Sequence, residues 1–311
     1  MIRTKIIKFS AITLTALFVI TIVAVLAIIN YFLPYSSIRP VRITHNKIVK
    51  LFYKHEKPSD YNLKYENFIL SVDKGIILRG WFIHSRFEKP KGTIIMMHGI
   101  ATSKESLLLM ADSLSAHGYN CLPFDSRAHG ESGGINCTFG YYEKHDVTKI
   151  INEIQKKYPD SGPFGVYGCS LGAAIGIQAM ALDGRIRTAV VESPFASLKE
   201  TVDHYWYNTS GLRINYIPEE ALKRSEKIAH FLVDSVKPVR SAFYVHNPVM
   251  VVYAEKDKNI PFNQTYRVFK NIKSHDKKLY EVKGADHYSI IKYGGHKYFK
   301  SVMDYFDRNM K

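Results

Sequence analysis

Gly168-Cys169-Ser170-Leu171-Gly172 is the most informative stretch of the sequence, because this Gly-x-Ser-x-Gly pattern joins two segments of different character. Residues 164–168 are typical of a short buried strand, and residues 171–182 of a helix rich in small side chains. A serine in such a sharp turn holds its hydroxyl clear of the sheet, and the glycines avoid clashes with the neighbouring strand and helix. The helix start adds N–H groups where an oxyanion would form. We predict that Ser170 is a nucleophile; the alternative is a glycine-rich packing contact.

Asp257 is the carboxylate that best fits this serine. In a strand–turn–helix serine site, the acid and then the base follow the nucleophile on loops after later strands. Asp257 follows the apolar run 248–254, which is typical of a central parallel strand, so its carboxylate can accept a histidine Nδ1 proton. Asp276 lies in a highly charged stretch and is interpreted as a solvated charge. Asp286 adjoins His287, so the two side chains diverge.

His287 is the predicted base. It lies at the end of a segment in which a predicted strand is followed, through Gly284, by a loop. In α/β sheets the functional residues lie on loops at the carboxyl ends of the strands. His275 lies in the charged stretch, and His296 stands at the start of the predicted last helix.

These residues resemble the α/β-hydrolase superfamily, and the resemblance runs from about Tyr65 to the C-terminus. Within it, the set resembles membrane-anchored bacterial serine hydrolases akin to serine aminopeptidases and monoglyceride lipases. Four further motifs carry it in the family's order: Met96-Met97-His98-Gly99-Ile100, Asp125-Ser-Arg-Ala-His-Gly-Glu-Ser132, Glu192-Ser-Pro-Phe195 and Gly284-Ala-Asp-His287.

The resemblance implies roles for further residues. The backbone N–H groups of Ile100 and Leu171 would form the oxyanion hole. Arg127 would pair with Asp146 in a structural motif. Glu192 is the alternative acid, because some members of the superfamily place the acid after the preceding strand.

The implied fold is an α/β-hydrolase fold, in which a mostly parallel sheet has helices on both faces. Strands are expected at 67–72, 76–84, 93–98, 120–125, 164–168, 188–192, 249–254 and 278–282. Helices are expected near 104–117, 143–158, 171–182, 262–272 and 296–308. The hydrolase domain is expected over 65–311.

Residues 197–247 interrupt this alternation, since they separate two strands by far more than an ordinary connection. They are expected to form a helical cap with an apolar, aromatic face that favours an acyl or aromatic group. The alternative is ordinary packing of two extra helices. The aromatic and aliphatic side chains of this face are Tyr205, Trp206, Tyr207, Ile214, Tyr216, Ile217, Phe231 and Leu232.

The N-terminus carries a second signal, because residues 9–33 contain no charge. As a helix they would span about 37 Å, which exceeds the roughly 30 Å of a hydrocarbon layer. We predict a short basic tail over 1–8, a single transmembrane anchor over 9–33 and a basic juxtamembrane connector over 34–64. The alternatives are a buried core helix and a cleaved signal peptide, which would have a shorter apolar region and a small-x-small cleavage site.

The positive charge of the chain gathers beside this anchor. The net charge is +15, and residues 1–58 hold nine Lys and Arg residues against one acid. Anionic headgroups therefore explain the charge better than nucleic acid, for which no binding module is recognisable. Ile48, Leu51 and Phe52 are spaced as in a short surface-lying helix. The flanking charges nearly balance, so the side of the membrane stays open, with the short basic tail favouring an extracytoplasmic enzyme.

The predicted function is hydrolysis of an ester, thioester or amide through a Ser170 acyl-enzyme, with esterase- or lipase-like activity favoured and a small-molecule or lipid-like acyl substrate. The alternatives are an acyltransferase and a membrane-tethered binding protein without turnover. The sequence indicates no cofactor and no metal ligand set, and it leaves the oligomeric state open. Cys121, Cys137 and Cys169 are interpreted as free thiols.

Overall fold

The computed structural model describes residues 2–42 and 57–310, with side chains from residue 12 onward. Within these ranges eight strands form one sheet in the order β1-β2-β4-β3-β5-β6-β7-β8. Strand β2 runs antiparallel to both of its neighbours, and the other neighbouring pairs are parallel. The strands are β1 (Tyr65–Asp73), β2 (Ile76–Ile83), β3 (Thr93–Met97), β4 (Asn120–Asp125), β5 (Phe164–Cys169), β6 (Ile186–Glu192), β7 (Val249–Ala254) and β8 (Lys277–Val282).

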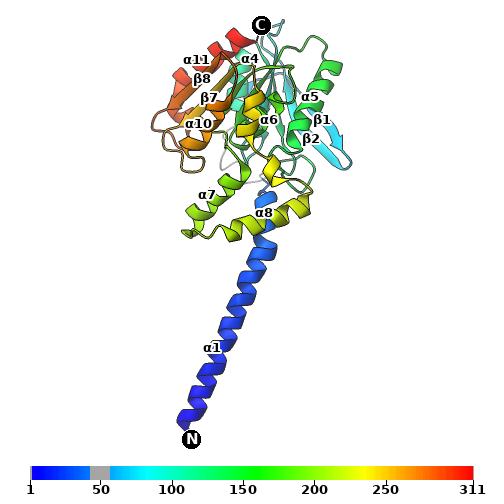
Figure 1. The fold of residues 1–311 in the computed structure, drawn as a ribbon. Coiled ribbons are helices and arrows are strands. Elements are labelled where there is room, and N and C mark those ends of the chain that lie inside the picture. Colours follow the sequence, from blue (N-terminus) through cyan, green and yellow to red (C-terminus); the bar gives the residue numbers. More distant parts are fainter. Residues whose placement is uncertain (1, 43–56, 311) are drawn as a thin grey trace.

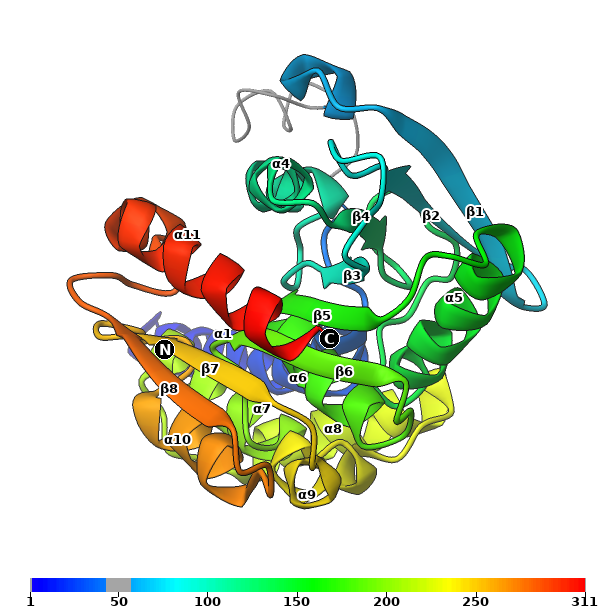
Figure 2. The ribbon, with the colours of Figure 1, turned by 90° about the horizontal axis from the view of Figure 1, so that it is seen from above.

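Helices cover both faces of the sheet, as Figure 2 shows. Helices α4 (Leu108–Ala116) and α11 (Ile290–Asn309) pack on one face, and their apolar side chains form one hydrophobic cluster with the strands. Helices α5 (Glu143–Lys157), α6 (Leu171–Met180) and α10 (Phe262–Asn271) pack on the other face within a second cluster. Burial on both faces explains the continuous apolar runs of the central strands. This is the α/β-hydrolase arrangement that the sequence predicts.

Two helices, α7 (Leu198–Ser210) and α8 (Tyr216–Ala229), make up most of the predicted cap. The chain then returns to the sheet through three short helical turns: η4 (Val233–Ser235), α9 (Pro238–Ser241) and η5 (Ala242–Tyr244). Both α7 and α8 lie at the end of the molecule from which the N-terminal helix projects (Figure 1).

The N-terminal helix is continuous and longer than the predicted anchor. It comprises α1 (Ile2–Ala27), one π-helical stretch, η1 (Ile28–Phe32), and α2 (Leu33–Ile38). Among the described residues it is the one helix long and apolar enough to cross a membrane, by length and composition alone, and signal sequences share those properties. It projects away from the rest of the protein (Figure 1), and its most apolar stretch is unburied.

Most predicted elements agree with the observed ones to within one or two residues, and the largest difference concerns the last helix. It begins at Ile290 rather than at residue 296, because helical turns lie on both sides of a break at Gly295 (φ 47°, ψ −151°). The predicted helix 104–117 starts as a 3₁₀ turn, η3 (Lys104–Leu107), before α4. In the predicted connector, the surface helix around Ile48, Leu51 and Phe52 lies outside the described residues. A 3₁₀ turn, η2 (Pro58–Tyr61), precedes β1.

Candidate active site

Ser170 lies in the sharp turn between β5 and α6. Its backbone adopts φ 51° and ψ −108°, a conformation that non-glycine residues rarely adopt. The turn has no room for side chains at its two glycines. A Cβ atom added to Gly168 would lie 2.5 Å from the carbonyl oxygen of Gly172, and one added to Gly172 would lie 2.2 Å from the carbonyl oxygen of Met97. The N–H of Ser170 donates to the Glu192 carbonyl at 2.8 Å, which ties the turn to β6. The strained conformation is therefore held by packing on both sides.

The structure brings Ser170, His287 and Asp257 into one chain of hydrogen bonds. The Nε2 atom of His287 lies 3.0 Å from Ser170 Oγ, and its Nδ1 atom lies 2.8 Å from Asp257 Oδ2. Asp257 follows β7 and His287 follows β8, so both stand at the carboxyl edge of the sheet, as does Ser170 after β5. With the proton on Nδ1, the ring donates to the carboxylate and its Nε2 accepts from the serine hydroxyl.

The Asp257 carboxylate is held by three further donors. The N–H groups of Asn259 and Ile260 donate to Oδ1 at 2.9 Å and 2.8 Å, and the Ser193 hydroxyl donates to Oδ2 at 2.8 Å. These three hydrogen bonds fix the orientation of the carboxylate beside His287. Sequence reasoning missed Ser193, although it follows Glu192 in a motif that carried the family resemblance.

Glu192, the alternative acid, points elsewhere. The hydroxyls of Tyr167 and Tyr298 donate to its Oε1, and the Cys169 thiol lies 3.4 Å from its Oε2. Burial raises the pKa of the Glu192 carboxyl above its usual range, and the two tyrosine hydroxyls oppose that rise. The His287 Nδ1 atom pairs with Asp257 instead.

The remaining acidic and histidine candidates lie apart from Ser170. Asp276 forms an ion pair with Arg308 at 3.0 Å, and exposed Asp286 accepts from the Ser289 hydroxyl at 2.6 Å. His275 and His296 are exposed.

The two proposed oxyanion donors, Ile100 and Leu171, line the same cavity as Ser170. Among the described residues, neither backbone N–H has a hydrogen-bond partner. The loop of Ile100 is fixed by His98, whose Nδ1 lies 2.7 Å from the Gly99 carbonyl and whose Nε2 accepts the Ser126 N–H at 3.0 Å. Burial lowers the pKa of His98, so the ring stays neutral and can accept at Nε2. Both free N–H groups are thus available to a ligand beside Ser170.

The motif around Arg127 is structural. Its guanidinium donates to both carboxylate oxygens of Asp146, at 2.5 and 2.6 Å, as the sequence predicts, and also to Asp73 in the β1–β2 hairpin. An ion pair that was not predicted joins buried Lys104 to Asp125 at 2.7 Å. These pairs fix the loops behind the site.

A cavity of about 360 Å³ opens beside Ser170. This size lies near the lower end of small-molecule sites, which span about 300–1,000 Å³. Its walls are largely apolar and come from the loop of Ile100, from α7 and α8, and from the end of the N-terminal helix. Of the apolar cap side chains that the sequence singled out, Tyr205 and Trp206 line it, whereas Tyr207, Ile214, Tyr216 and Leu232 are exposed to solvent.

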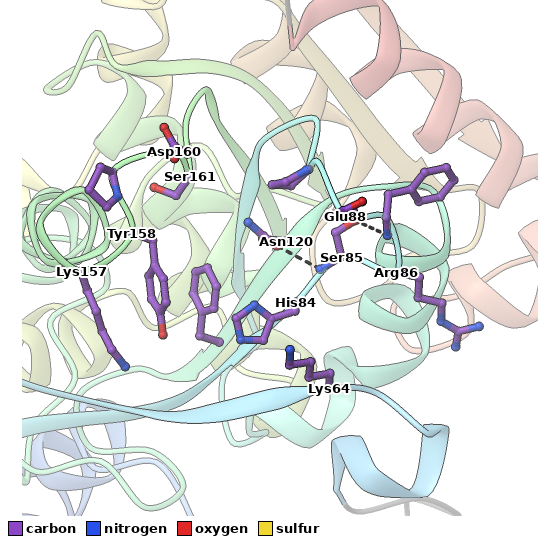
Figure 3. Close-up of a pocket in the computed structure, with 14 residues that line it drawn as sticks. Lys64, His84, Ser85, Arg86, Glu88, Asn120, Lys157, Tyr158, Asp160 and Ser161 are labelled. Atoms are coloured by element: carbon purple, nitrogen blue, oxygen red, sulfur yellow. Dashed lines mark hydrogen bonds between the residues drawn. The ribbon is translucent and has the colours of Figure 1, made fainter.

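A larger cavity of about 690 Å³, whose lining Figure 3 shows, shares no residue with the cavity beside Ser170. It is lined by the end of β2 and the segment 84–90 that follows it, and by residues at or before the amino ends of β4 and β5. Among them is Asn120, whose side chain accepts the Ser85 N–H at 2.9 Å. Because Ser170 lies at the carboxyl edge, this cavity is not part of the candidate active site. No cluster of three or more His, Cys, Asp or Glu side chains in the described part of the chain is arranged to hold a metal ion.

Comparisons with known proteins agree with this architecture. Residues 88–234 match the Hydrolase_4 family, described as serine aminopeptidase, S33. The chain belongs to the α/β-hydrolase superfamily. The uncharacterized protein YqkD of Bacillus subtilis is 27% identical over 252 residues, which cover 77% of this chain and 78% of YqkD. YitV of the same organism, whose name provisionally calls it an esterase, is 25% identical over 196 residues, or 58% of this hydrolase and 74% of YitV.

Solved structures share the fold at lower identity. The Pyrococcus furiosus esterase Pf2001 superposes with a TM-score of 0.71 and 22% identity, covering 88% of this α/β hydrolase and 98% of that chain. The Pyrococcus horikoshii acylaminoacyl peptidase superposes with a TM-score of 0.62 and 18% identity, and the match covers 80% of this chain and 42% of the peptidase. Esterases and peptidases therefore share this fold, so the fold alone does not identify the substrate.

Proposed function

We propose that this α/β hydrolase is a membrane-anchored serine esterase that cleaves acyl esters through an acyl-enzyme on Ser170. One observation carries the proposal: the hydrogen-bonded series Ser170–His287–Asp257 ends on a hydroxyl that faces an apolar cavity. The names of Pf2001 and YitV support an ester substrate. Thioester and amide cleavage use the same intermediate.

The reaction follows from this geometry. His287 Nε2 takes the proton from Ser170 Oγ as the oxygen attacks the acyl carbon. The N–H groups of Ile100 and Leu171 stabilise the oxyanion of the tetrahedral intermediate. Its collapse breaks the bond to the leaving alcohol, which receives the proton from His287. Water then attacks the acyl-enzyme with the same base, and the acid and free Ser170 are released.

The anchor is the apolar N-terminal helix. We assign residues 1–8 to a basic tail, 9–33 to the anchor, 34–64 to the connector and 65–311 to the hydrolase domain with its cap at 197–247. The described helix supports this assignment by its length, its lack of charge over the anchor and its exposed surface.

Hydrolysis of p-nitrophenyl acetate by the full-length protein in detergent tests the proposed activity. We expect activity in the wild type and in Ser210→Ala, a control for an exposed serine at the end of α7, and none above background in Ser170→Ala. Equal activity in Ser170→Ala would reject the proposed nucleophile, provided that all three proteins unfold at similar temperatures.

A further inference from the structure

We infer that the end of the N-terminal helix forms a wall of the acyl-binding cavity, and that the cavity receives the acyl chain of a bilayer-resident amphiphile. The inference rests on the proposed function and deepens it, since it assigns the substrate to membrane-borne acyl esters. In this account the side chains of Leu33 and Ser36 determine which acyl chains the cavity accepts.

The helix is joined rigidly to the hydrolase domain. Pro34 and Ile38 of α2 are buried, the Ser225 hydroxyl of α8 donates to the Pro34 carbonyl at 2.9 Å, and the Cys137 N–H donates to the Ile38 carbonyl at 2.7 Å. Just beyond α2, the Arg42 guanidinium donates to the backbone carbonyls of residues 130, 132 and 134. A helix held in this way fixes both the height and the tilt of the domain above a membrane.

The same helix end borders the cavity that contains Ser170. Leu33, Ser36 and Ser37 line the cavity together with Ser170 and with side chains of α7 and α8. The hydroxyls of Ser36 and Ser37 donate to the Leu33 carbonyl at 3.0 and 2.9 Å, so their protons are used within the helix. This wall therefore offers no free hydroxyl donor and suits a hydrocarbon chain better than a polar group.

The position of α2 along the helix places the cavity near the membrane surface. A hydrocarbon layer takes up about 20 helical residues, so a span that starts at Phe9 ends near residue 29. At about 1.5 Å per residue, Leu33 then lies about 6 Å beyond the hydrocarbon layer. Tyr31, Phe32 and Tyr35 are exposed at this level, where aromatic side chains are favoured.

The cap presents further apolar side chains on this side of the protein. Helices α7 and α8 lie where α1 leaves the domain, and α8 runs across the direction of α1 (Figure 1). Leu212, Ile214 and Tyr216, at the turn between α7 and α8, are 49%, 46% and 66% exposed. Exposed apolar groups beside an anchor are suited to the headgroup region. An acyl chain can then pass from the bilayer along α2 to Ser170 without crossing water.

A bulky side chain on the α2 wall tests this route. The full-length protein is reconstituted in phosphatidylcholine–phosphatidylglycerol vesicles and assayed with 4-methylumbelliferyl oleate in the bilayer and with water-soluble 4-methylumbelliferyl acetate. We expect Ser36→Trp to lower oleate hydrolysis at least about tenfold, because the indole fills the cavity, while acetate hydrolysis changes far less. Tyr35→Trp places the same side chain at the adjacent exposed position outside the cavity and should leave both rates unchanged.

A second arm identifies the source of the acyl chain. Oleate ester in the same vesicles as the enzyme should react at least about tenfold faster than ester in separate vesicles, because a shared bilayer raises the effective concentration. Equal rates in the two arrangements, or unchanged oleate hydrolysis in Ser36→Trp, would overturn the inference. If Ser170→Ala keeps acetate hydrolysis, the proposed function itself fails, so the two failures are distinguishable.

Discussion

The hydroxyl of Ser193 donates a 2.8 Å hydrogen bond to Asp257 Oδ2, the same oxygen that faces His287 Nδ1. Ser193 directly follows β6, and its backbone has a positive φ of 48°. Asp257 lies in the loop after β7, the strand next to β6. The carboxylate is therefore oriented across two strands, which makes Ser193 a positioning residue for the proposed acid.

Removal of the Ser193 hydroxyl should lower kcat without a comparable change in KM. A hydrogen bond to a carboxylate contributes about 1.5–3 kcal/mol, so Ser193→Ala should lose about 10- to 100-fold in kcat. Steady-state kinetics on p-nitrophenyl acetate measure this effect. Ser193→Gly also removes the hydroxyl and suits the positive φ of 48°, so similar losses in the Ala and Gly variants would assign the effect to the hydroxyl rather than to the backbone. If neither variant lowers kcat, the hydroxyl does not act on Asp257.

Asp257 and Glu192 should differ sharply in their effect on turnover. Asp257→Asn should lower kcat by about 10³–10⁴, because the histidine loses the acceptor that fixes its tautomer. Glu192→Gln should affect chiefly the thermal unfolding temperature, since its carboxylate pairs with Tyr167 and Tyr298. The opposite ranking of the two kcat values would identify Glu192 as the acid.

Acidification should destabilise the fold through His129. Burial lowers the pKa of His129 to about 3, with a smaller contribution from the neighbouring His98 ring. A histidine in the unfolded chain titrates near about 6.5, so the unfolded state takes up this proton first. The stabilising contribution is complete above about pH 6.5 and is lost as the pH falls toward 3. At pH 5 the loss from one such group is about 2 kcal/mol.

Thermal unfolding of the detergent-solubilised protein at pH 7 and pH 5 measures this contribution. His129→Asn removes the titrating ring and should show a smaller fall in unfolding temperature between the two pH values. The difference in unfolding temperature between pH 7 and pH 5 can be compared even if the variant is less stable than the wild type at both pH values. Identical falls in the variant and the wild type would exclude His129 as a source of the pH dependence.

The membrane anchor predicts a simple fractionation result. The full-length protein should stay in the pellet after carbonate extraction, and deletion of residues 2–27 should release the domain. The deletion has to stop before Leu33, because α2 contributes to the cavity and packs on α8. Recovery of the intact chain in the soluble fraction would refute the anchor, and protease accessibility on intact cells would report the side of the membrane.

The sequence was sufficient to predict the fold and to place Ser170, Asp257 and His287 after three of its strands, because the glycine-rich turn, the apolar run before Asp257 and Gly284 are local signals. The catalytic roles of the three residues stay predictions. The sequence did not reveal Ser193 or the Lys104–Asp125 pair, since their partners are distant in sequence and neither has a local pattern. The contribution of α2 to the cavity was also missed. The uncharged pattern of the N-terminal helix gives no sign of which residues contact the domain, and this contact depends on packing against α8.

Fluorophosphonate labelling of the full-length protein, followed by peptide mass spectrometry, tests the central claim most directly. We predict one adduct, on Ser170, formed in the wild type, absent in Ser170→Ala and formed much more slowly in His287→Ala. An adduct on another residue, or equal labelling of Ser170→Ala, would contradict the account.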